Sequence, residues 1–277
     1  MTNTATDTDR PMRPTEAATY QQLRGHLAEL KLTAAAETLT AVLDTARAQD
    51  LPVITVLEKL LAVQVHADRD RRHAGLLRLA GLPAPYTLEE FDFAAQPGVD
   101  EKLIRELASL RFLDDAGNIL FVGKPGTGKT MLAIALARAA IDAGLRTHFT
   151  TAADLAKRCH KAAVEGRWAT TMRFYCNPRL LVIDEFAYAT SNPDPGANTA
   201  LFEVISRRYL KSSTIVTSHA GVASWGERLG DPMLAASLLD RLLHRGIVVA
   251  IDGPSYRMRA HQQRTEQLRQ AITASTR

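Results

Sequence analysis

The spacing of apolar residues divides the chain into a helical first part and an alternating second part. In the first part apolar residues recur at helical spacing, and Leu23, Leu27 and Leu30 fall on one face of the first expected helix. The expected helices cover residues 15–30, a stretch from about residue 33, and residues 53–79. We predict a flexible tail over residues 1–14 and a small all-helical module over residues 15–80, suited to partner or oligomer contacts.

In the second part, short apolar runs alternate with stretches of helical spacing. The runs are NILFV, RTHFT, RLLVID, STIVTS and GIVVAI. Strands that alternate with helices are joined by right-handed crossovers, which gives a parallel sheet covered on both faces. We therefore predict an α/β domain with a five-stranded parallel sheet over residues 99–260. A segment punctuated by proline and glycine, residues 81–98, is expected to link it to the helical module.

The composition is that of a globular protein, with 277 residues of which 46% are hydrophobic and 23% charged. Two cysteines, Cys159 and Cys176, are too few for a disulfide framework, so we expect reduced thiols. The polar start lacks a signal-peptide core, and the longest apolar run is too short and polar to cross a bilayer. These features favour a soluble, cytoplasmic protein without membrane contact.

The small positive net charge, +4, comes from the end of the chain. Residues 1–255 hold equal numbers of Lys/Arg and Asp/Glu, whereas residues 256–277 hold five arginines and one glutamate. A basic segment of this kind either contacts phosphate backbones or forms a solvated terminal helix, and charge alone leaves both open. We predict a basic tail over residues 261–277.

The first candidate site is the stretch GKPGTGKT, which follows the expected strand NILFV and precedes an expected helix. This is the context that a phosphate-binding loop requires. Glycines let backbone N–H groups turn toward phosphate oxygens, and the helix N-terminus adds partial positive charge. Lys129 is expected at the β- and γ-phosphates of a nucleotide, and the Thr130 hydroxyl at Mg²⁺. The predicted nucleotide-binding residues are Gly123, Lys124, Pro125, Gly126, Thr127, Gly128, Lys129, Thr130 and Met131.

A second candidate site lies in the stretch LLVIDEF. Asp184 comes at the carboxyl end of an expected buried strand, where α/β sheets bind ligands, and is predicted to hold Mg²⁺ through a water. Glu185 is suited to deprotonate a water that attacks the γ-phosphate, which favours hydrolysis over transfer to a small acceptor. The alternative is that Glu185 is only a surface charge after a strand.

Three further residues are catalytic candidates. His219, after the expected strand STIVTS, either helps to place the attacking water or points into the following loop. Arg241 is the candidate for an arginine that a neighbouring subunit inserts at the γ-phosphate, and Arg257 for a contact within the same subunit. The alternatives are an ion pair of Arg241 with Asp240, and Arg257 as one more basic tail residue.

Together with GKPGTGKTMLAIALA, the stretches FTTAADL, LLVIDE, LFEVISRRY, SWGE, GDPMLAASLLDRLLH and SYRMR resemble the IstB family. These proteins are ATPase helpers of insertion-sequence transposases and are related to DnaC-type helicase loaders. The resemblance covers roughly residues 23–259. It implies an AAA+ ATPase that binds double-stranded DNA, forms a homo-oligomer with ATP at the subunit interfaces, and engages a cognate transposase.

The resemblance also implies roles for single residues. Lys129 and Thr130 match the Walker A pair. Asp184 and Glu185 match the Walker B pair. Arg241 matches the arginine finger and Arg257 the second sensor. His219 departs from the family pattern, in which asparagine is usual, so the hydrolysis rate and its pH dependence stay open.

The function expected from the sequence is ATP-dependent preparation of target DNA for a transposase. One alternative is a helicase loader with the same ATPase core and a preference for single strands. Another is a nucleotide-gated DNA-binding scaffold with negligible turnover, which the histidine at position 219 keeps open. A small-molecule kinase is disfavoured by Glu185 and by the lack of an acceptor-site motif.

Overall fold

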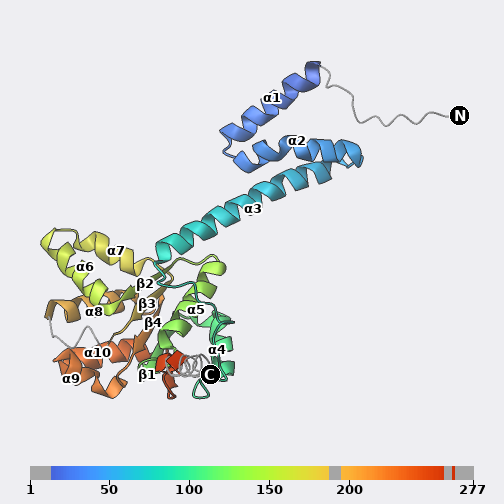
Figure 1. Cartoon of the computed structure of the whole chain (residues 1–277). Helices are drawn as coiled ribbons and strands as arrows, with labels where there is room; N and C mark the ends of the chain where they lie inside the picture. The colour runs from blue at the N-terminus through green and yellow to red at the C-terminus, as the bar shows by residue number, and fades with distance from the viewer. Residues whose placement is uncertain (1–13, 187–194, 259–263, 266–277) are drawn as a thin grey trace, which may run out of the picture. The chain divides into compact units, whose positions relative to one another are not determined.

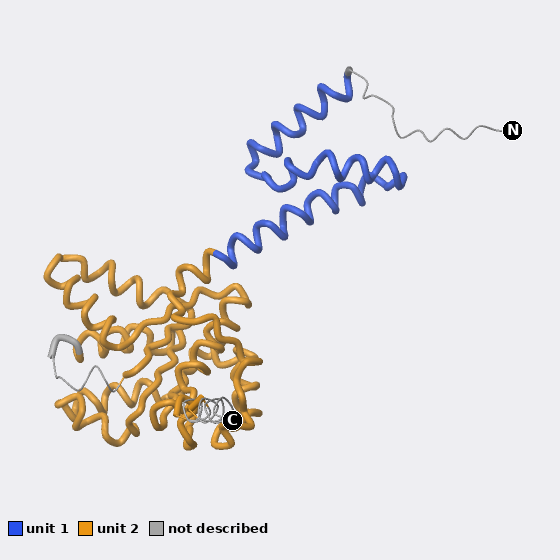
Figure 2. The backbone as a smooth tube through the Cα atoms, viewed as in Figure 1, with its two compact units in different colours: residues 1–74 blue, residues 75–277 orange. Residues whose placement is uncertain are grey.

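The structure, a computed structural model, describes residues 14–186, 195–258 and 264–265. The chain divides into two compact units, residues 1–74 and 75–277 (Figure 2). The division falls inside helix α3 (Val53–Ala80), a little before the end of the predicted helical module. Nearly all of the predicted flexible tail and of the predicted basic tail lies outside the described residues.

The described residues of the first unit form three helices joined by short turns, which confirms the helices expected from the apolar spacing. It contains α1 (Pro14–Glu29), α2 (Thr33–Ala48) and most of α3 (Figure 1). Leu27, Leu39 and Leu60 bring the three helices together around a small core. Of the three leucines expected on one face of α1, only Leu27 is buried, whereas Leu23 and Leu30 are exposed. Leu30 lies just beyond α1, which ends at Glu29.

The second unit contains a parallel sheet of five strands, as predicted (Figure 1). The strands are β1 (Asn118–Gly123), β2 (Thr147–Thr151), β3 (Leu180–Asp184), β4 (Ser213–Ser218) and β5 (Gly246–Ile251). Their order in the sheet is β2-β3-β4-β1-β5, and all four neighbouring pairs are parallel. The central strands read as continuous apolar runs because helices cover both faces of the sheet.

Two hydrophobic layers flank this sheet. On one face, alternate strand residues such as Ile119 and Val182 pack with α4 and α5, and on the other face Leu120 and Ile183 pack with α6 to α10. The helices are α4 (Glu101–Ala108), α5 (Lys129–Asp142), α6 (Ala152–Val164), α7 (Trp168–Cys176), α8 (Pro195–Arg208), α9 (Trp225–Leu229) and α10 (Pro232–Leu243). Two short 3₁₀ turns, η1 (Arg111–Leu113) and η2 (Val222–Ser224), complete the unit. No helix of the described ranges is long and apolar enough to cross a membrane.

The sheet order decides which residues meet at its carboxyl edge. β4 lies between β1 and β3, so the ends of these three strands are neighbours. Val122 is paired with Ser218, and Asp184 ends the strand on the other side of β4. The loop after β1 and the acidic pair after β3 therefore come together, although about 60 residues separate them along the chain.

Candidate functional site

The loop after β1 has a backbone conformation that only glycine adopts readily at two positions. Gly126 has φ +80° and Gly128 has φ +95°, both in the left-handed region. A Cβ atom on Gly126 would lie 2.2 Å from Ser255 Oγ, and one on Gly128 would lie 2.6 Å from Phe91 Cε2. Glycine is thus required both by the turn and by the close approach of two segments from outside the motif.

Lys129 is the first residue of α5, and its side chain is buried. Its Nζ donates a hydrogen bond to the Lys124 carbonyl at 2.7 Å. An ammonium group has three donors, so two remain for phosphate oxygens. Burial lowers the pKa of Lys129 and nearby Arg257 lowers it too, whereas Asp184 raises it. A phosphate bound here would replace the solvation that burial has removed from the ammonium group.

The two residues predicted to hold Mg²⁺ are hydrogen-bonded to each other. Thr130 Oγ1 donates to Asp184 Oδ1 at 2.9 Å and lies 3.2 Å from Oδ2. Asp184 is buried at the end of β3, and the Thr217 hydroxyl donates to the same Oδ1. A hydroxyl at the start of α5 and a carboxylate at the end of β3 are oxygen ligands of the kind that Mg²⁺ prefers, so the residues present fit this cation.

Thr217, a buried residue near the end of β4, also fixes the residue that follows Asp184. Its Oγ1 accepts the backbone N–H of Glu185 at 3.0 Å, and its carbonyl accepts the N–H of Phe186 at 2.9 Å. Glu185 has φ +55°, which is uncommon for a residue with a side chain. The hydroxyl of Thr217 therefore joins the two acidic residues and holds the turn that aims the second one. From the sequence, this threonine is expected only as part of the strand STIVTS.

Replacing Thr217 by valine is expected to lower the kcat of the expected ATP hydrolysis about tenfold, while the affinity for ATP changes little. Valine has nearly the same shape but cannot form hydrogen bonds with the Asp184 carboxylate or the N–H of Glu185. The orientation of both carboxylates is then less fixed. Thr217→Ser keeps the hydroxyl and is the matched control, with a rate close to wild type. Steady-state phosphate release and ATP titration measure the two quantities. Equal losses in valine and serine variants, or a loss confined to affinity, would remove Thr217 from this role.

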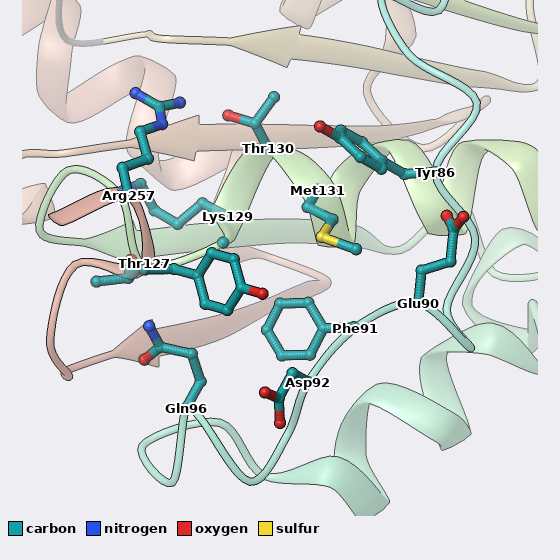
Figure 3. A pocket seen from close by; sticks show the side chains of 13 residues that line it. Tyr86, Glu90, Phe91, Asp92, Gln96, Thr127, Lys129, Thr130, Met131 and Arg257 are labelled. Atoms are coloured by element: carbon teal, nitrogen blue, oxygen red, sulfur yellow. The ribbon is translucent and has the colours of Figure 1, made fainter. Parts of the chain in front are cut away.

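A cavity of about 430 Å³ adjoins the phosphate-binding loop. Its volume is in the usual range for small-molecule sites. It is lined by Tyr86, Glu90, Phe91, Asp92, Gln96, Gly126, Thr127, Gly128, Lys129, Thr130, Met131, Tyr256 and Arg257. Of the predicted nucleotide-binding residues, Gly123, Lys124 and Pro125 do not line it. In Figure 3, Lys129 and Arg257 lie toward one side of the cavity and Tyr86 and Met131 toward the other.

Five of these lining residues come from residues 81–98, the segment expected to be a linker. Phe91 is buried against Gly128, and Gln96 Nε2 donates to the Pro254 carbonyl at 2.7 Å. The segment thus forms a wall of the cavity as well as joining two parts of the chain. Its aromatic residues, in the stretch YTLEEFDF, were a signal that the sequence reasoning did not use.

The segment after β5 closes the other side of the loop. The N–H of Tyr256 donates to the Gly126 carbonyl at 2.9 Å, which places Arg257 among the lining residues. Lys124 and Asp252 form an ion pair at 3.2 Å, with both side chains largely exposed. The structure therefore brings Arg257 to the cavity of its own chain, where a same-subunit contact with phosphates was predicted.

Arg241 lies outside this cavity. Its Nη1 donates to the Ser237 carbonyl at 2.7 Å, and its guanidinium lies 4.9 Å from the centre of the Phe202 ring. No ion pair with Asp240 is found among the residues the structure describes, so that alternative has no support. His244 and Arg245 lie just beyond α10, which ends at Leu243.

His219 directly follows β4 and is half-buried. Burial lowers its pKa, the charges of Arg228 and Lys129 lower it further, and Glu185 raises it. The imidazole is thus close enough to interact electrostatically with both Lys129 and Glu185, but it does not line the cavity. Because its pKa lies below the usual value, the ring is neutral at pH 7 and keeps one donor nitrogen.

Several known proteins are similar to this chain in sequence. The family model described as "IstB-like ATP binding protein" matches residues 25–264. A protein of Geobacillus stearothermophilus, named for ATP binding in insertion sequence IS5376, is 39% identical over 239 residues, covering 86% of this chain and 94% of the relative. Its counterpart in IS21 of Pseudomonas aeruginosa is 38% identical over 233 residues, covering 84% and 87%.

Solved structures share the fold of the second unit. The crystal structure of DnaI has a TM-score of 0.53 at 15% identity, covering 61% of this chain and 92% of that one. The AMPPCP-bound DnaA of Aquifex aeolicus has a TM-score of 0.53 at 20% identity, covering 68% and 56%. At these identities the likeness establishes an AAA+ P-loop fold. Since the family match spans most of the sequence and agrees with the site, the chain belongs to the family of IstB-like ATP-binding proteins.

Proposed function

We propose that this protein hydrolyses ATP with Mg²⁺, assembles on duplex DNA as a homo-oligomer, and recruits or activates a transposase. The observation that carries the hydrolytic part is the hydrogen-bonded set of Thr130, Asp184, Thr217 and Glu185 beside the phosphate-binding loop. A protein that only grips a nucleotide has no need of a second carboxylate held in a left-handed turn.

The residues around the phosphate-binding loop have different chemical tasks in the proposed reaction. Lys129 and Arg257 bind the phosphates, and the oxygens of Thr130 and Asp184 hold the cation. Mg²⁺ bound there would neutralise the charge that develops on the transferred phosphoryl group. Glu185 accepts a proton from the water that attacks the γ-phosphorus, while the bond from that phosphorus to the β-γ bridging oxygen breaks and ADP leaves.

The aromatic wall of the cavity is suited to the base of the nucleotide. Tyr86 and Phe91 from residues 81–98, Tyr256 from the segment after β5, and Met131 of α5 line it together. Flat apolar rings are favourable surfaces for a purine, which is itself flat and largely apolar on its faces. Hydrogen-bond donors for phosphates lie next to an aromatic wall for the base, so the cavity matches the two chemically different ends of ATP.

The names of the relatives support the DNA-related part of the proposal. They are described as ATP-binding proteins of insertion sequences, elements whose movement needs a transposase. The position of Arg241 supports assembly, because this half-buried arginine lies outside the cavity of its own chain, where it could complete the site of a neighbour. ATP between subunits would then make assembly depend on the nucleotide state.

The proposal is tested by Glu185→Gln. This substitution keeps shape and hydrogen bonding but removes the proton acceptor, so hydrolysis is expected to fall about 100-fold. ATP binding should persist, and the variant should remain on duplex DNA after ATP addition, when the wild type dissociates. Phosphate release and anisotropy of a labelled duplex measure both effects.

Two outcomes would contradict the proposal. Equal, near-zero rates in the wild type and the Glu185→Gln variant would leave a nucleotide-gated scaffold without turnover. Tighter binding to single strands than to duplex of the same length would instead favour a helicase loader. A matched substitution, Glu106→Gln on the exposed surface of α4, should change neither rate nor DNA affinity.

A further inference from the structure

A second hollow lies at the edge of the sheet opposite the ATP site. It has a volume of about 510 Å³ and is lined by Cys176, Asn177, Pro178, Arg179, Arg207, Lys211 and Ser212. These residues belong to the end of α7, the turn before β3, the end of α8 and the turn before β4. β3 and β4 are adjacent and parallel, so their amino ends meet here and their carboxyl ends meet at Asp184. A five-residue strand spans roughly 16 Å, which separates the hollow from the ATP cavity.

The lining of this hollow is positively charged. It contains Arg179, Arg207 and Lys211 and no acidic residue. Arg207 pairs with Glu203 at 2.6 Å, whereas Arg179 donates to the Leu113 carbonyl at 2.6 Å. Lys211 has no ion pair with any residue in the described ranges. Three cations thus share one carboxylate, which leaves a positive potential in the hollow.

A fourth cation, Arg208, lies beneath the hollow with only 1% of its surface exposed. Its guanidinium donates to the carbonyls of Tyr175 and Pro178, each at 2.9 Å, and to Thr214 Oγ1 at 3.1 Å. Burial lowers the pKa of Arg208 to about 10, so it remains charged at neutral pH. It has no carboxylate partner in the described part of the chain, and it ties the turn before β3 to the start of β4. Arg208 therefore both stiffens the hollow and adds a positive charge without a counter-charge.

Two polar groups in the hollow are consistent with an anionic ligand. Ser212 is 8% exposed, and its buried hydroxyl has no hydrogen-bond partner within the described residues, which is unusual for a buried group. Burial raises the pKa of the Cys176 thiol, although Arg208, Arg207 and Lys211 lower it, so the thiol stays neutral at pH 7. The cysteine therefore does not cancel the positive charge around it.

We propose that this hollow binds a phosphate of the duplex-DNA backbone, with Arg207 and Lys211 as the contacting cations. The inference rests on the proposed function, in which the protein assembles on duplex DNA. Arg207 and Lys211 are exposed on two different elements, α8 and the turn after it, so an extended phosphate chain can lie across them. Phosphate contacts of this kind position a protein on DNA without reading its sequence.

The test is the double substitution Arg207→Gln/Lys211→Gln in the full chain. Its matched control is Lys102→Gln/Arg105→Gln on α4, which removes one exposed lysine and one arginine paired with a glutamate four residues earlier. Duplex affinity is measured by fluorescence anisotropy over a series of salt concentrations, with a non-hydrolysable ATP analogue. Loss of two phosphate contacts should weaken binding about tenfold or more at 0.1 M salt and make the salt slope shallower by roughly 1 to 2. The control should follow the wild type.

Several outcomes would overturn the inference. If the wild type binds duplex DNA and the double variant has the same affinity and slope as the control, the hollow does not contact DNA. If inorganic phosphate raises the unfolding temperature of the wild type but not of the double variant, while the salt slope is unchanged, the site serves a free phosphate ion. If the wild type fails to bind duplex DNA at all, the proposed function fails together with this inference. ATP affinity and unfolding temperature, measured for each variant, show whether the substitutions act only at the hollow.

Discussion

Lys129→Ala is expected to weaken ATP binding on the order of 10³-fold. The ammonium group is buried at the start of α5, with one donor on the Lys124 carbonyl and two directed to no other described residue. It therefore supplies charge-assisted hydrogen bonds to phosphates in a place from which water is largely excluded. Truncation removes these bonds and leaves the phosphates of the bound nucleotide with a missing partner. Titration with a fluorescent ATP analogue measures the loss.

Lys124→Ala is the matched control, because it removes a lysine from the same loop. Its Nζ forms a largely exposed ion pair with Asp252, and such pairs contribute little. The side chain does not line the cavity, so ATP affinity should stay within about threefold of wild type. If Lys129→Ala also stayed within that range, the assignment of the loop as the phosphate site would be wrong. Unfolding temperatures of both variants exclude a general loss of structure.

Arg241→Ala is expected to lower ATP hydrolysis on the order of 10³-fold while ATP binding by the single chain persists. In its own chain this arginine is held by Ser237 and the Phe202 ring, away from the cavity. In the proposed oligomer its effect on hydrolysis comes through a neighbouring subunit, whose developing phosphate charge it would neutralise. Assembly in the presence of ATP should weaken as well, and light scattering measures it.

Mixing two inactive variants separates an effect between subunits from an effect within one. Glu185→Gln still offers an intact Arg241, and Arg241→Ala still offers an intact Glu185, so mixed oligomers should regain part of the activity. Arg245→Ala is the control, since this exposed arginine donates to the Asp115 carbonyl just beyond α10 and should be dispensable for hydrolysis. No recovery on mixing, with assembly intact, would place the action of Arg241 within its own chain.

Local patterns were enough to predict the sheet and the phosphate-binding loop. Each strand is a short apolar run, and the loop is specified by a contiguous motif whose conformation depends on its own glycines. Gly126 and Gly128 show why the prediction worked, because their left-handed backbone is a local requirement. The same reasoning identified Asp184 and Glu185, since the end of a buried strand is readable from the sequence.

The residues that the sequence did not reveal depend on contacts between distant segments. Phe91 and Gln96 meet the loop and the segment after β5 only once the chain has folded. Thr217 gains its role because β4 happens to lie next to β3 in the sheet order, which no local pattern states. Arg208 lies at the end of α8, and its burial against carbonyls of two turns follows from the sheet order and not from any local pattern.

The packing of Phe91 against Gly128 has a consequence for communication along the chain. The ring touches the loop that would wrap the phosphates, and the backbone from Phe91 leads directly back to the end of α3. The segment between Ala80 and Phe91 is therefore fixed at both ends, by the end of α3 and by the packing of the Phe91 ring on the loop. A change in the conformation of the loop would reach this segment first through the Phe91 ring.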